Sequence, residues 1–291
     1  MLADQIVNGL VLGAVYSLAA VSFALVMGVL GVLNVASAAL FLLGGYIGVD
    51  MISGGSSVWG ALLVVIAATG LGGIVVERVG YRPFRDSPVV IPLLSTLGLT
   101  IVVQGVVINV WGSDPIQLGA SPLKGRVELA GIALTATELL IVGAAVVILV
   151  GIGALMRWTW MGRSIRAVAE DRHAASLLGV PAVKVTIATF ALSGLLAGTA
   201  GLLIGLNYGV LSPTSGLEVG LKGIAVMVVG GVRNIWGGLL AGPLLGIAEV
   251  LAIAYGDSAW RDMVLWGFLL LVLLVRPEGL FSRGEASPQR A

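Results

Sequence analysis

The sequence contains no cysteine and only one histidine, His173. Without cysteine the chain can form no disulfide and offers neither a thiolate metal ligand nor a cysteine nucleophile. A lone histidine also argues against a metal site built from several imidazole ligands. We therefore expect no metal site and no cofactor in this chain.

Charged residues are scarce as well. Asp, Glu, Lys and Arg make up 11% of the 291 residues, whereas soluble domains average roughly 25%. The net charge is +1 and no basic cluster is interleaved with aromatic residues, so we expect no nucleic-acid partner. Hydrophobic residues make up 58%. This balance predicts an all-α polytopic membrane protein, with a single transmembrane domain over residues 1–291 in contact with membrane lipid.

Motifs for nucleotide hydrolysis and acyl transfer are also missing. The only lysines are Lys124, Lys184 and Lys222, and none lies in a G-x-x-x-x-G-K-[ST] phosphate loop. No G-x-S-x-G nucleophile motif occurs either. We therefore expect no enzyme activity, and energy for any pumping must come from another subunit. No chain of carboxylates and histidines runs through the apolar segments, which argues against a proton-driven carrier.

Long apolar runs fill the chain instead. A helix needs about 20 apolar residues to cross a hydrocarbon core of about 30 Å, and the runs are near that length. The start, MLADQIVNGL, lacks the basic region and small-residue cleavage site of a secretory signal, so we expect the first run to stay in the mature protein. The pattern predicts about eight or nine transmembrane helices. The runs lie at about 6–28, 33–52, 57–77, 89–110, 138–156, 184–205, 217–232, 237–255 and 260–276.

The basic residues lie mainly on one side of these spans. The loops of one side hold twelve Lys or Arg residues, and those of the other side hold Lys124, Arg126 and Arg261. By the positive-inside rule the richer side faces the cytoplasm. With an odd number of spans the N-terminus is then outside and the C-terminus is cytoplasmic. The twelve are Arg78, Arg82, Arg85, Arg157, Arg163, Arg166, Arg172, Lys184, Arg233, Arg276, Arg283 and Arg290.

Two loops between spans are long. The outer loop, about 111–137, includes KGRVELAGIALTATE, whose β-branched residues around a glycine predict a short hairpin over the outer mouth. The inner loop, about 157–184, includes IRAVAEDRHAASLLGV. Its good helix formers predict a helix over 164–178, which Gly179 and Pro181 end.

This inner helix has two readings. It would place Ile165, Val168 and either Ala175 or Arg172 on one side, with Arg166, Glu170 and His173 on the others. Such a short helix can sit in a groove on a partner and transmit rigid-body motion. Alternatively it is a cytoplasmic cap helix whose charges are simply solvated.

Glycine is abundant, with 43 residues, and several lie four apart within the spans. That spacing puts them on one helical face, where small residues let neighbouring helices approach closely in lipid. One reading is tight packing within the subunit, especially at Gly238, Gly242 and Gly246. A sharper reading makes VGGVRNIWGGLLAGPLLG a helix–turn–helix that re-enters the bundle, with the glycines letting it slide.

Ionisable groups at membrane depth are expensive and therefore mark candidate functional sites. Glu218 and Lys222 are four apart and can pair on one helical face, either as a structural pair or as part of a site. Glu249 has no local basic partner and either faces a water-filled path or bonds to another helix. Uncharged polar residues of the second and fourth spans could line a path as a group: Asn34, Ser37, Ser95, Thr96, Thr100 and Gln104.

Within the inner loop, AASLLG (Ala174–Gly179) fits the A-A-x-x-x-G core of the EAA loop, the cytoplasmic segment by which bacterial ABC importer permeases contact their ATPase. His173 stands where that pattern places a glutamate. Longer segments make the chain similar, in order and over nearly its whole length, to the branched-chain amino acid ABC transporter permease family, in its LivH-like branch. They are NGLVLGAVYSLAAVSFALVMGVLGVLNVA, ERVGYRPFRDSPVVIPLLSTLGLT, MGRSIRAVAEDRHAASLLGV, GLKGIAVMVVGGVRNIWGGLLAGPLLGIAEVL and RPEGLF.

The resemblance implies a permease subunit of the bacterial inner membrane, driven by ATP through alternating access. A second permease subunit, identical or related, two cytoplasmic ATPase subunits that bind ATP and Mg, and a periplasmic solute-binding protein would complete the importer. The residues that would contact the ATPase are Arg166, Ala169, Glu170, Asp171, His173, Ala174, Ala175 and Gly179.

One departure leaves the substrate open. Family members usually continue N-F-A-H-G in the second span, whereas this chain has Ser37 for the histidine and Ala38 for the glycine. Relatives handle Leu, Ile and Val, other amino acids, urea and short amides, or small carboxylates. Two other functions stay open: an ion-coupled secondary carrier or facilitator that uses Glu249 and the Glu218–Lys222 pair, and a non-transporting membrane scaffold.

Overall fold

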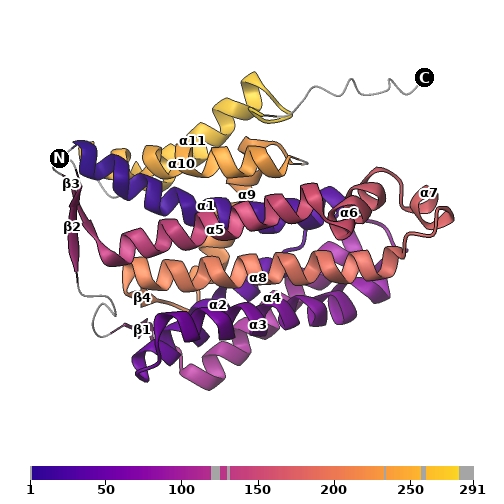
Figure 1. Ribbon diagram of the computed structural model, residues 1–291, viewed down its shortest axis with the longest axis horizontal. Coiled ribbons are helices and arrows are strands. Elements are labelled where there is room, and N and C mark those ends of the chain that lie inside the picture. The colour runs from indigo at the N-terminus through magenta and orange to yellow at the C-terminus, as the bar shows by residue number, and fades with distance from the viewer. Residues whose placement is uncertain (1, 119–124, 130–131, 233, 257–259, 282–291) are drawn as a thin grey trace.

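The computed structural model describes residues 2–118, 125–129, 132–232, 234–256 and 260–281. Every predicted apolar run contains a helix (Figure 1). Seven helical segments are long and apolar enough to cross a membrane. Their helices are α1 (Leu2–Leu30), α2 (Ala36–Ser53), α3 (Val58–Val76), α4 (Val90–Trp111), α5 (Ala136–Trp158), α8 (Ala182–Tyr208) and α10 (Ile235–Tyr255).

The two remaining runs form shorter helices, α9 (Ser215–Gly230) and α11 (Trp260–Val275), of 16 residues each. At 1.5 Å per residue each is about 24 Å long, less than the hydrocarbon thickness of about 30 Å. The protein is therefore a mainly helical, multi-pass membrane protein. The number of eight or nine spans stays a prediction.

Short non-helical segments lie at one end of the bundle. The strands β2 (Arg126–Leu129) and β3 (Ile132–Thr135) pair antiparallel, with Arg126 opposite Thr135, as the sequence of the outer loop predicted. A second pair, β1 (Ile116–Gln117) and β4 (Val210–Leu211), joins the start of that loop to the end of α8. Thr135 and Glu138 form a reciprocal capping box that starts α5 directly after β3.

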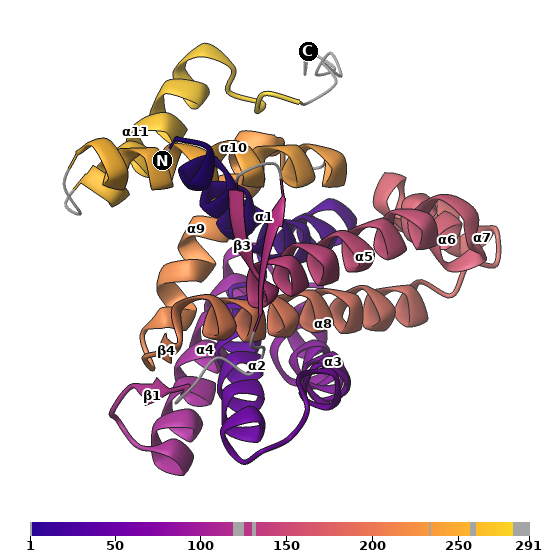
Figure 2. The same cartoon turned by 60° about the vertical axis from the view of Figure 1, so that its left-hand side comes forward.

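Helix α1 is the centre of the bundle. Almost every residue from Gly9 to Val26 is buried, because α1 contacts α5, α8, α9 and α10. Figure 2 shows α10 and α11 on one side of α1 and the group of α2, α3 and α4 on the other. By contrast, α3, α4 and α5 expose aliphatic side chains such as Leu63, Ile101 and Val147, as expected for faces that contact lipid.

Glycines bring the central helices into backbone contact. A Cβ atom on Gly246 of α10 would lie 2.5 Å from the backbone nitrogen of Gly13, and one on Gly242 would lie 2.5 Å from the Gly13 carbonyl oxygen. At Gly238 the nearest atom, the Cβ of Ala20, is 3.5 Å away, so this third position of the predicted triple has room for a side chain. The α1–α10 seam therefore depends on Gly242 and Gly246.

Helices α9 and α10 follow one another closely in the segment VGGVRNIWGG, whereas its re-entry into the bundle and sliding stay predictions. Helix α9 ends at Gly230, Gly231 adopts a positive φ of 105°, and the Asn234 side chain accepts a hydrogen bond of 3.1 Å from Trp236 N at the start of α10. A Cβ on Gly230 would lie 2.5 Å from the backbone nitrogen of Gly238, so the two helix ends touch.

Candidate functional site

The inner loop folds as two helices, α6 (Trp160–Glu170) and α7 (Arg172–Leu177). The prediction of one helix over 164–178 was therefore wrong. Asp171 interrupts it with an extended backbone, and its Oδ1 accepts hydrogen bonds from the backbone N–H groups of His173 (2.7 Å) and Ala174 (2.9 Å). A short acidic side chain satisfies the free donors at a helix start, so this sequence favours a new helix over a continued one. These two bonds lower the pKa of Asp171.

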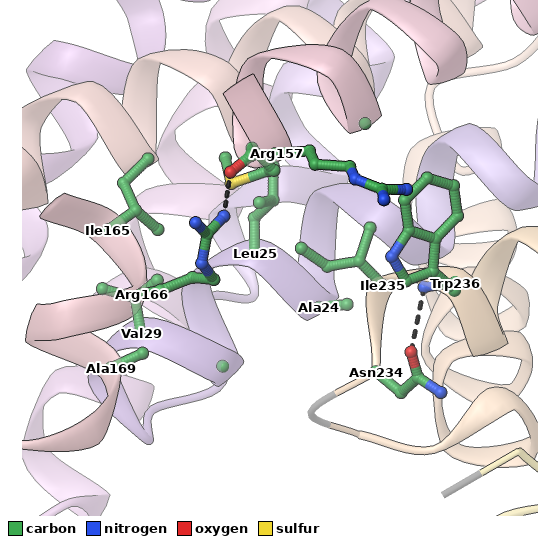
Figure 3. A pocket seen from close by; sticks show the side chains of 13 residues that line it. Ala24, Leu25, Val29, Arg157, Ile165, Arg166, Ala169, Asn234, Ile235 and Trp236 are labelled. Atoms are coloured by element: carbon green, nitrogen blue, oxygen red, sulfur yellow. Dashed lines mark hydrogen bonds between the residues drawn. The ribbon is translucent and has the colours of Figure 1, made fainter. Parts of the chain in front are cut away.

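The loop helices have one apolar side. Ile165, Val168 and Ala175 are buried, which agrees with the face expected from their spacing. Arg166 Nη1 donates to the main-chain carbonyl of Met156 at the end of α5 (Figure 3). The contacts hold α6 against the bundle, so a force on the loop would reach the membrane helices.

The outer surface of the loop carries the remaining predicted coupling residues. Glu170, His173 and Ala174 are exposed, Ala169 is half-buried, and Gly179 adopts a positive φ of 82° that ends the segment. Leu177 and Leu178, at the tip, are 76% and 85% exposed. Sequence reasoning did not single them out, although two adjacent leucines in an otherwise polar loop are a visible signal.

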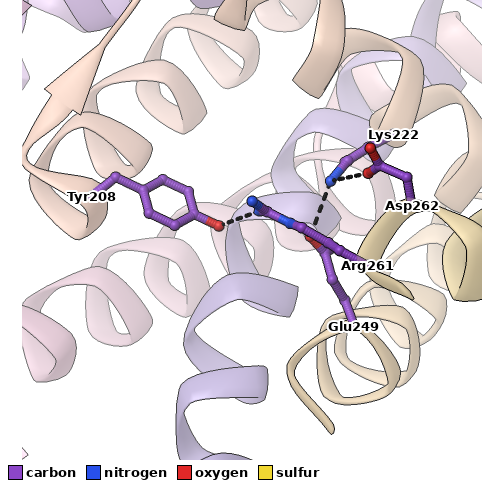
Figure 4. A network of polar contacts seen from close by, with 5 residues as sticks. All are labelled: Tyr208, Lys222, Glu249, Arg261 and Asp262. Carbon is purple, nitrogen blue, oxygen red and sulfur yellow. Dashed lines mark hydrogen bonds and ion pairs between the residues drawn. The ribbon is translucent and has the colours of Figure 1, made fainter. Parts of the chain in front are cut away.

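A cluster of charged residues lies where the C-terminal part of α10 meets the start of α11 (Figure 4). Lys222 of α9 contacts two carboxylates, with Nζ 2.9 Å from Glu249 Oε1 and 3.1 Å from Asp262 Oδ1. Arg261 Nε also donates to Glu249 Oε1. Its Nη2 donates to the Tyr208 hydroxyl at 2.6 Å, and the guanidinium lies 5.6 Å from that ring's centroid. This charged cluster joins α8, α9, α10 and α11.

The cluster corrects the predicted Glu218–Lys222 pair, because Lys222 bonds to Glu249 and Asp262 instead. Glu218 is exposed. Glu249, which lacked a local partner in the sequence, bonds across to two other helices. Its side chain is 0% exposed, and its Oε2 has no hydrogen-bond partner in the described chain. A buried carboxylate needs compensating charge, and Lys222 and Arg261 both supply it at Oε1.

Access to the cluster comes from the side of α11. The side chain of Lys222 is 11% exposed, that of Arg261 34% and that of Asp262 68%. Two cations and two anions leave the cluster without net charge. Groups of this kind can bind a carboxylate at one place and an ammonium at another.

An uncharged cluster lies deeper, between α1, α2 and α8. Ser193 Oγ is 3.0 Å from Ser22 Oγ and 3.1 Å from Ser37 Oγ, and Asn34 Nδ2 donates to Ser37 Oγ at 3.1 Å. All four side chains are at most 1% exposed. We call Ser22, Asn34, Ser37 and Ser193 the hydroxyl cluster. Ser22 and Ser193 were not among the predicted site residues.

The fourth span contributes less than expected. Thr96 Oγ1 accepts a hydrogen bond of 3.3 Å from the backbone nitrogen of Val35, next to Asn34. Thr100 bonds to its own helix at Thr96 O. No hydrogen bond within the described part of the chain joins Ser95 or Gln104, both half-buried on α4, to either cluster. The residues described also contain no group of three His, Asp or Glu side chains able to hold a metal ion.

The family model of the branched-chain amino acid transport system permease component matches residues 5–274. The chain is 34% identical to the high-affinity branched-chain amino acid transport system permease protein BraD of Pseudomonas aeruginosa, over 97% of this chain and 96% of that protein. It is also 34% identical to LivH of Escherichia coli over the same shares. A more distant relative is the probable permease protein LivH of Methanocaldococcus jannaschii, 29% identical over 75% of this chain and 72% of that protein. The chain belongs to the branched-chain amino acid transport system permease family.

Proposed function

We propose that the protein is the permease subunit of an ATP-binding-cassette importer that moves branched-chain amino acids, or a related small polar solute, into the cell. The observation that carries this proposal is the end-to-end similarity to permease proteins of such systems, over 97% of the chain. In a family member with 11% charged residues and several long apolar helices, transport across a membrane is the function that the architecture supports.

Energy would come from two partner ATPase subunits that bind ATP and Mg, since the sequence has no phosphate loop of its own. We assign the contact to α6 and α7, through Arg166, Ala169, Glu170, Asp171, His173, Ala174, Ala175 and Gly179. Support comes from the buried Ile165 and Val168, which anchor the segment, and from the exposed Leu177 and Leu178, which offer apolar area to a partner.

The orientation follows from the basic loops. The arginine-rich side would face the cytoplasm of a bacterial inner membrane, with the N-terminus outside and the C-terminus inside. A periplasmic binding protein and a second permease subunit would complete the assembly. In this orientation the charged cluster lies in the outer third of α10, because Glu249 is the fifteenth of 21 residues in that helix.

For the solute path, the structure favours the charged cluster over the hydroxyl cluster. An amino acid carries one ammonium and one carboxylate, and the cluster has partly exposed groups of both signs. Of the predicted path residues we therefore keep Lys222, with Arg261 and Asp262 as the more exposed groups, whereas Glu249, whose side chain is 0% exposed, holds the two cations in place. Asn34 Nδ2, Ser37 and Thr96 are buried and hydrogen-bonded to neighbouring groups, which suits a role in packing, while Asn34 Oδ1 has no hydrogen-bond partner in the described chain.

Reconstituted uptake tests the proposal. The chain would be co-expressed with the ATPase and second permease subunits and placed in proteoliposomes with the binding protein, and leucine uptake would be measured. We expect leucine uptake only when ATP is present on the side of the membrane where the ATPase subunits lie. We expect no ATPase activity from the isolated chain. Robust leucine uptake by the chain alone, without nucleotide, would overturn the assignment, and dependence on an ion gradient would identify a secondary carrier instead.

A double variant tests the coupling segment. Replacing Arg166 and Glu170 together by alanine should abolish ATP-driven uptake while the assembled subunit remains in the membrane. The matched control is the double replacement of Arg85 and Asp86 by alanine, an exposed basic and acidic pair in the loop before α4. Unchanged uptake by the double variant would show that α6 does not couple to the ATPase.

A further inference from the structure

A cavity of about 450 Å³ opens where the arginine-rich ends of α1, α5, α6 and α10 meet (Figure 3). Its wall is mostly apolar and includes Leu25, Gly153, Ile235 and Trp236. Two basic side chains, Arg157 and Arg166, also line it, and no carboxylate does. The cavity is therefore an apolar space with two cationic side chains on its wall.

The two arginines differ in how they are held. Arg166 donates from Nη1 to the Met156 carbonyl, which fixes its guanidinium at the end of α5 and leaves its other N–H groups available. Arg157 is exposed and has no hydrogen bond or ion pair to any residue that the structure describes. Two guanidiniums beside one cavity suit an anion such as a phosphate, which guanidinium groups bind through paired hydrogen bonds.

The cavity continues into two exposed apolar strips. On α5, Val146 (50% exposed) and Val150 (63%) lie on the same helical face as Gly153 and Arg157, at spacings of four, three and four. On α10, Trp236, Leu240 and Leu244 are 54%, 52% and 46% exposed and lie four apart. Helix α1 packs against both α5 and α10 and forms the floor between them.

The arginines also lie at the depth of lipid headgroups. Helix α5 has 23 residues, so at 1.5 Å per residue it is about 35 Å long and reaches past a hydrocarbon core of about 30 Å. Arg157 is its penultimate residue. Trp158 and Trp160, next in the chain, are 74% and 58% exposed, and exposed tryptophans are typical of the interface between hydrocarbon and water.

We propose that this cavity binds an anionic phospholipid of the cytoplasmic leaflet. Its phosphate lies between Arg157 and Arg166, and one acyl chain follows the apolar strips of α5 and α10 over α1. Basic pockets between transmembrane helices on the cytoplasmic side favour such headgroups. The leaflet rests on the orientation proposed above, whereas the lipid class rests on the two arginines and the apolar strips. Because Arg166 belongs to α6, the bound lipid would also steady the helix that leads to α7.

Lipid retention by the purified full-length chain tests the proposal. Native mass spectrometry would compare added dioleoylphosphatidylglycerol with dioleoylphosphatidylcholine, at equal concentrations in detergent. We expect preferential retention of phosphatidylglycerol.

Arg157→Gln should lower that retention about fivefold, the effect of one basic residue near an anionic headgroup. Arg157→Lys should largely keep it. Arg157 is suited to this test because its substitution breaks no bond within the described chain.

The control is Arg163→Gln, since Arg163 is exposed on α6, six residues beyond Arg157 in the chain, and does not line the cavity. Equal losses from Arg157→Gln and Arg163→Gln would overturn the proposal, because general surface charge would then explain retention. Equal retention of the neutral lipid would overturn it too. Displacement of the lipid by millimolar glycerol 3-phosphate would show a site for a soluble phosphate and no need for the acyl chain.

A second variant tests the acyl chain separately. A Cβ on Gly153 would lie 2.8 Å from the Trp236 ring, so Gly153→Leu would fill the cavity without removing charge. We expect it to lower phosphatidylglycerol retention as strongly as Arg157→Gln. Undiminished retention in a folded Gly153→Leu protein contradicts the proposed chain path; if that variant does not fold, the Arg157 comparison decides. No ATPase or substrate is needed, so the result is independent of the transport assay.

Discussion

The charged cluster and the hydroxyl cluster are both polar groups inside an apolar bundle, yet they differ in access and in connection. The charged cluster joins α9, α10 and α11 through ion pairs, and Asp262 is 68% exposed at its edge. The hydroxyl cluster joins α1, α2 and α8 through short side chains that are at most 1% exposed. One cluster is open at its edge, whereas the other is enclosed.

The packing around the hydroxyl cluster is also tighter than the packing around the charged cluster. The helices of the hydroxyl cluster touch backbone to backbone, as where Gly201 of α8 lies over Phe41 and Gly45 of α2. Helix α11, which supplies Arg261 and Asp262, buries only Leu265 and Val272. A tightly packed region has a single low-energy arrangement, whereas a loosely packed helix can move at a lower cost in free energy. The comparison assigns tight packing to α1, α2 and α8 and looser packing to α11.

Loss of the central carboxylate should have the largest effect. Glu249→Ala would leave the buried Lys222 and the half-buried Arg261 without their shared partner, and breaking a buried ion pair from one side costs about 3–5 kcal/mol. We expect a fall of that size in the free energy of unfolding in detergent and loss of ATP-driven uptake.

The double replacement Lys222→Met and Glu249→Met is its control, because removal of both charges should cost less than the sum of the single losses. If the loss of unfolding free energy in the double variant equalled the sum of the losses from Lys222→Met and Glu249→Met alone, the two residues would not act together.

A glycine pair tests the difference in packing. A Cβ on Gly201 would lie 2.9 Å from Gly45 N, whereas one on Gly267 of α11 would meet nothing within 4 Å. Gly201→Ala should therefore cost about 1–3 kcal/mol by overpacking. Gly267→Ala should be neutral or slightly stabilising, since alanine favours a helix over glycine. Equal shifts in thermal unfolding would contradict the assignment of a tight and a loose region.

A hydroxyl deletion should have a smaller effect. Ser193→Ala removes the bonds to Ser22 and Ser37, and a hydrogen bond of this kind contributes about 1 kcal/mol. We expect a small loss in the free energy of unfolding with leucine uptake retained. Strongly reduced uptake with unchanged stability would instead place the hydroxyl cluster on the solute path.

The smallest effect concerns the exposed carboxylate of Asp171, which contrasts with the buried Glu249. Backbone N–H groups of Ala174 and His173 lower its pKa below the ordinary value of 3.8. Its contribution to α7 is therefore fully present above pH 3.8 and is lost as the pH falls through the lower folded value. We expect Asp171→Ala to raise hydrogen exchange at the amides of residues 173 and 174 several-fold at neutral pH, while Asp171→Asn, which can still cap, raises it less. No change in either variant would refute the cap.

These residues also show where prediction from the sequence succeeds. Apolar run length located the seven described helical segments that are long enough to cross a membrane, and the spacing of Ile165, Val168 and Ala175 identified the buried side of the inner loop. Run length and residue spacing are both local properties, because each is set by the residues of a single segment. The break at Asp171 was missed for a related reason: within a run of good helix formers, average propensity outweighed the capping signal of one residue.

The pairing of charges could not be predicted in the same way. From the sequence, Lys222 has a carboxylate four residues before it, and local spacing favours Glu218. Its actual partners are 27 and 40 positions later in the chain, on α10 and α11. Ser22 and Ser193 meet across 171 positions. Contacts of this kind depend on how helices rotate and cross.

The sequence by itself determined the membrane class, the helices and membership of the permease family, because composition and local order encode them. Only the tertiary structure decided which charges meet at Glu249, which glycines are indispensable, and that Arg157 and Arg166 share one cavity. The physical reason is the same in each case. Helix packing in lipid is set by close contact between particular faces, and those faces come from segments far apart in the chain.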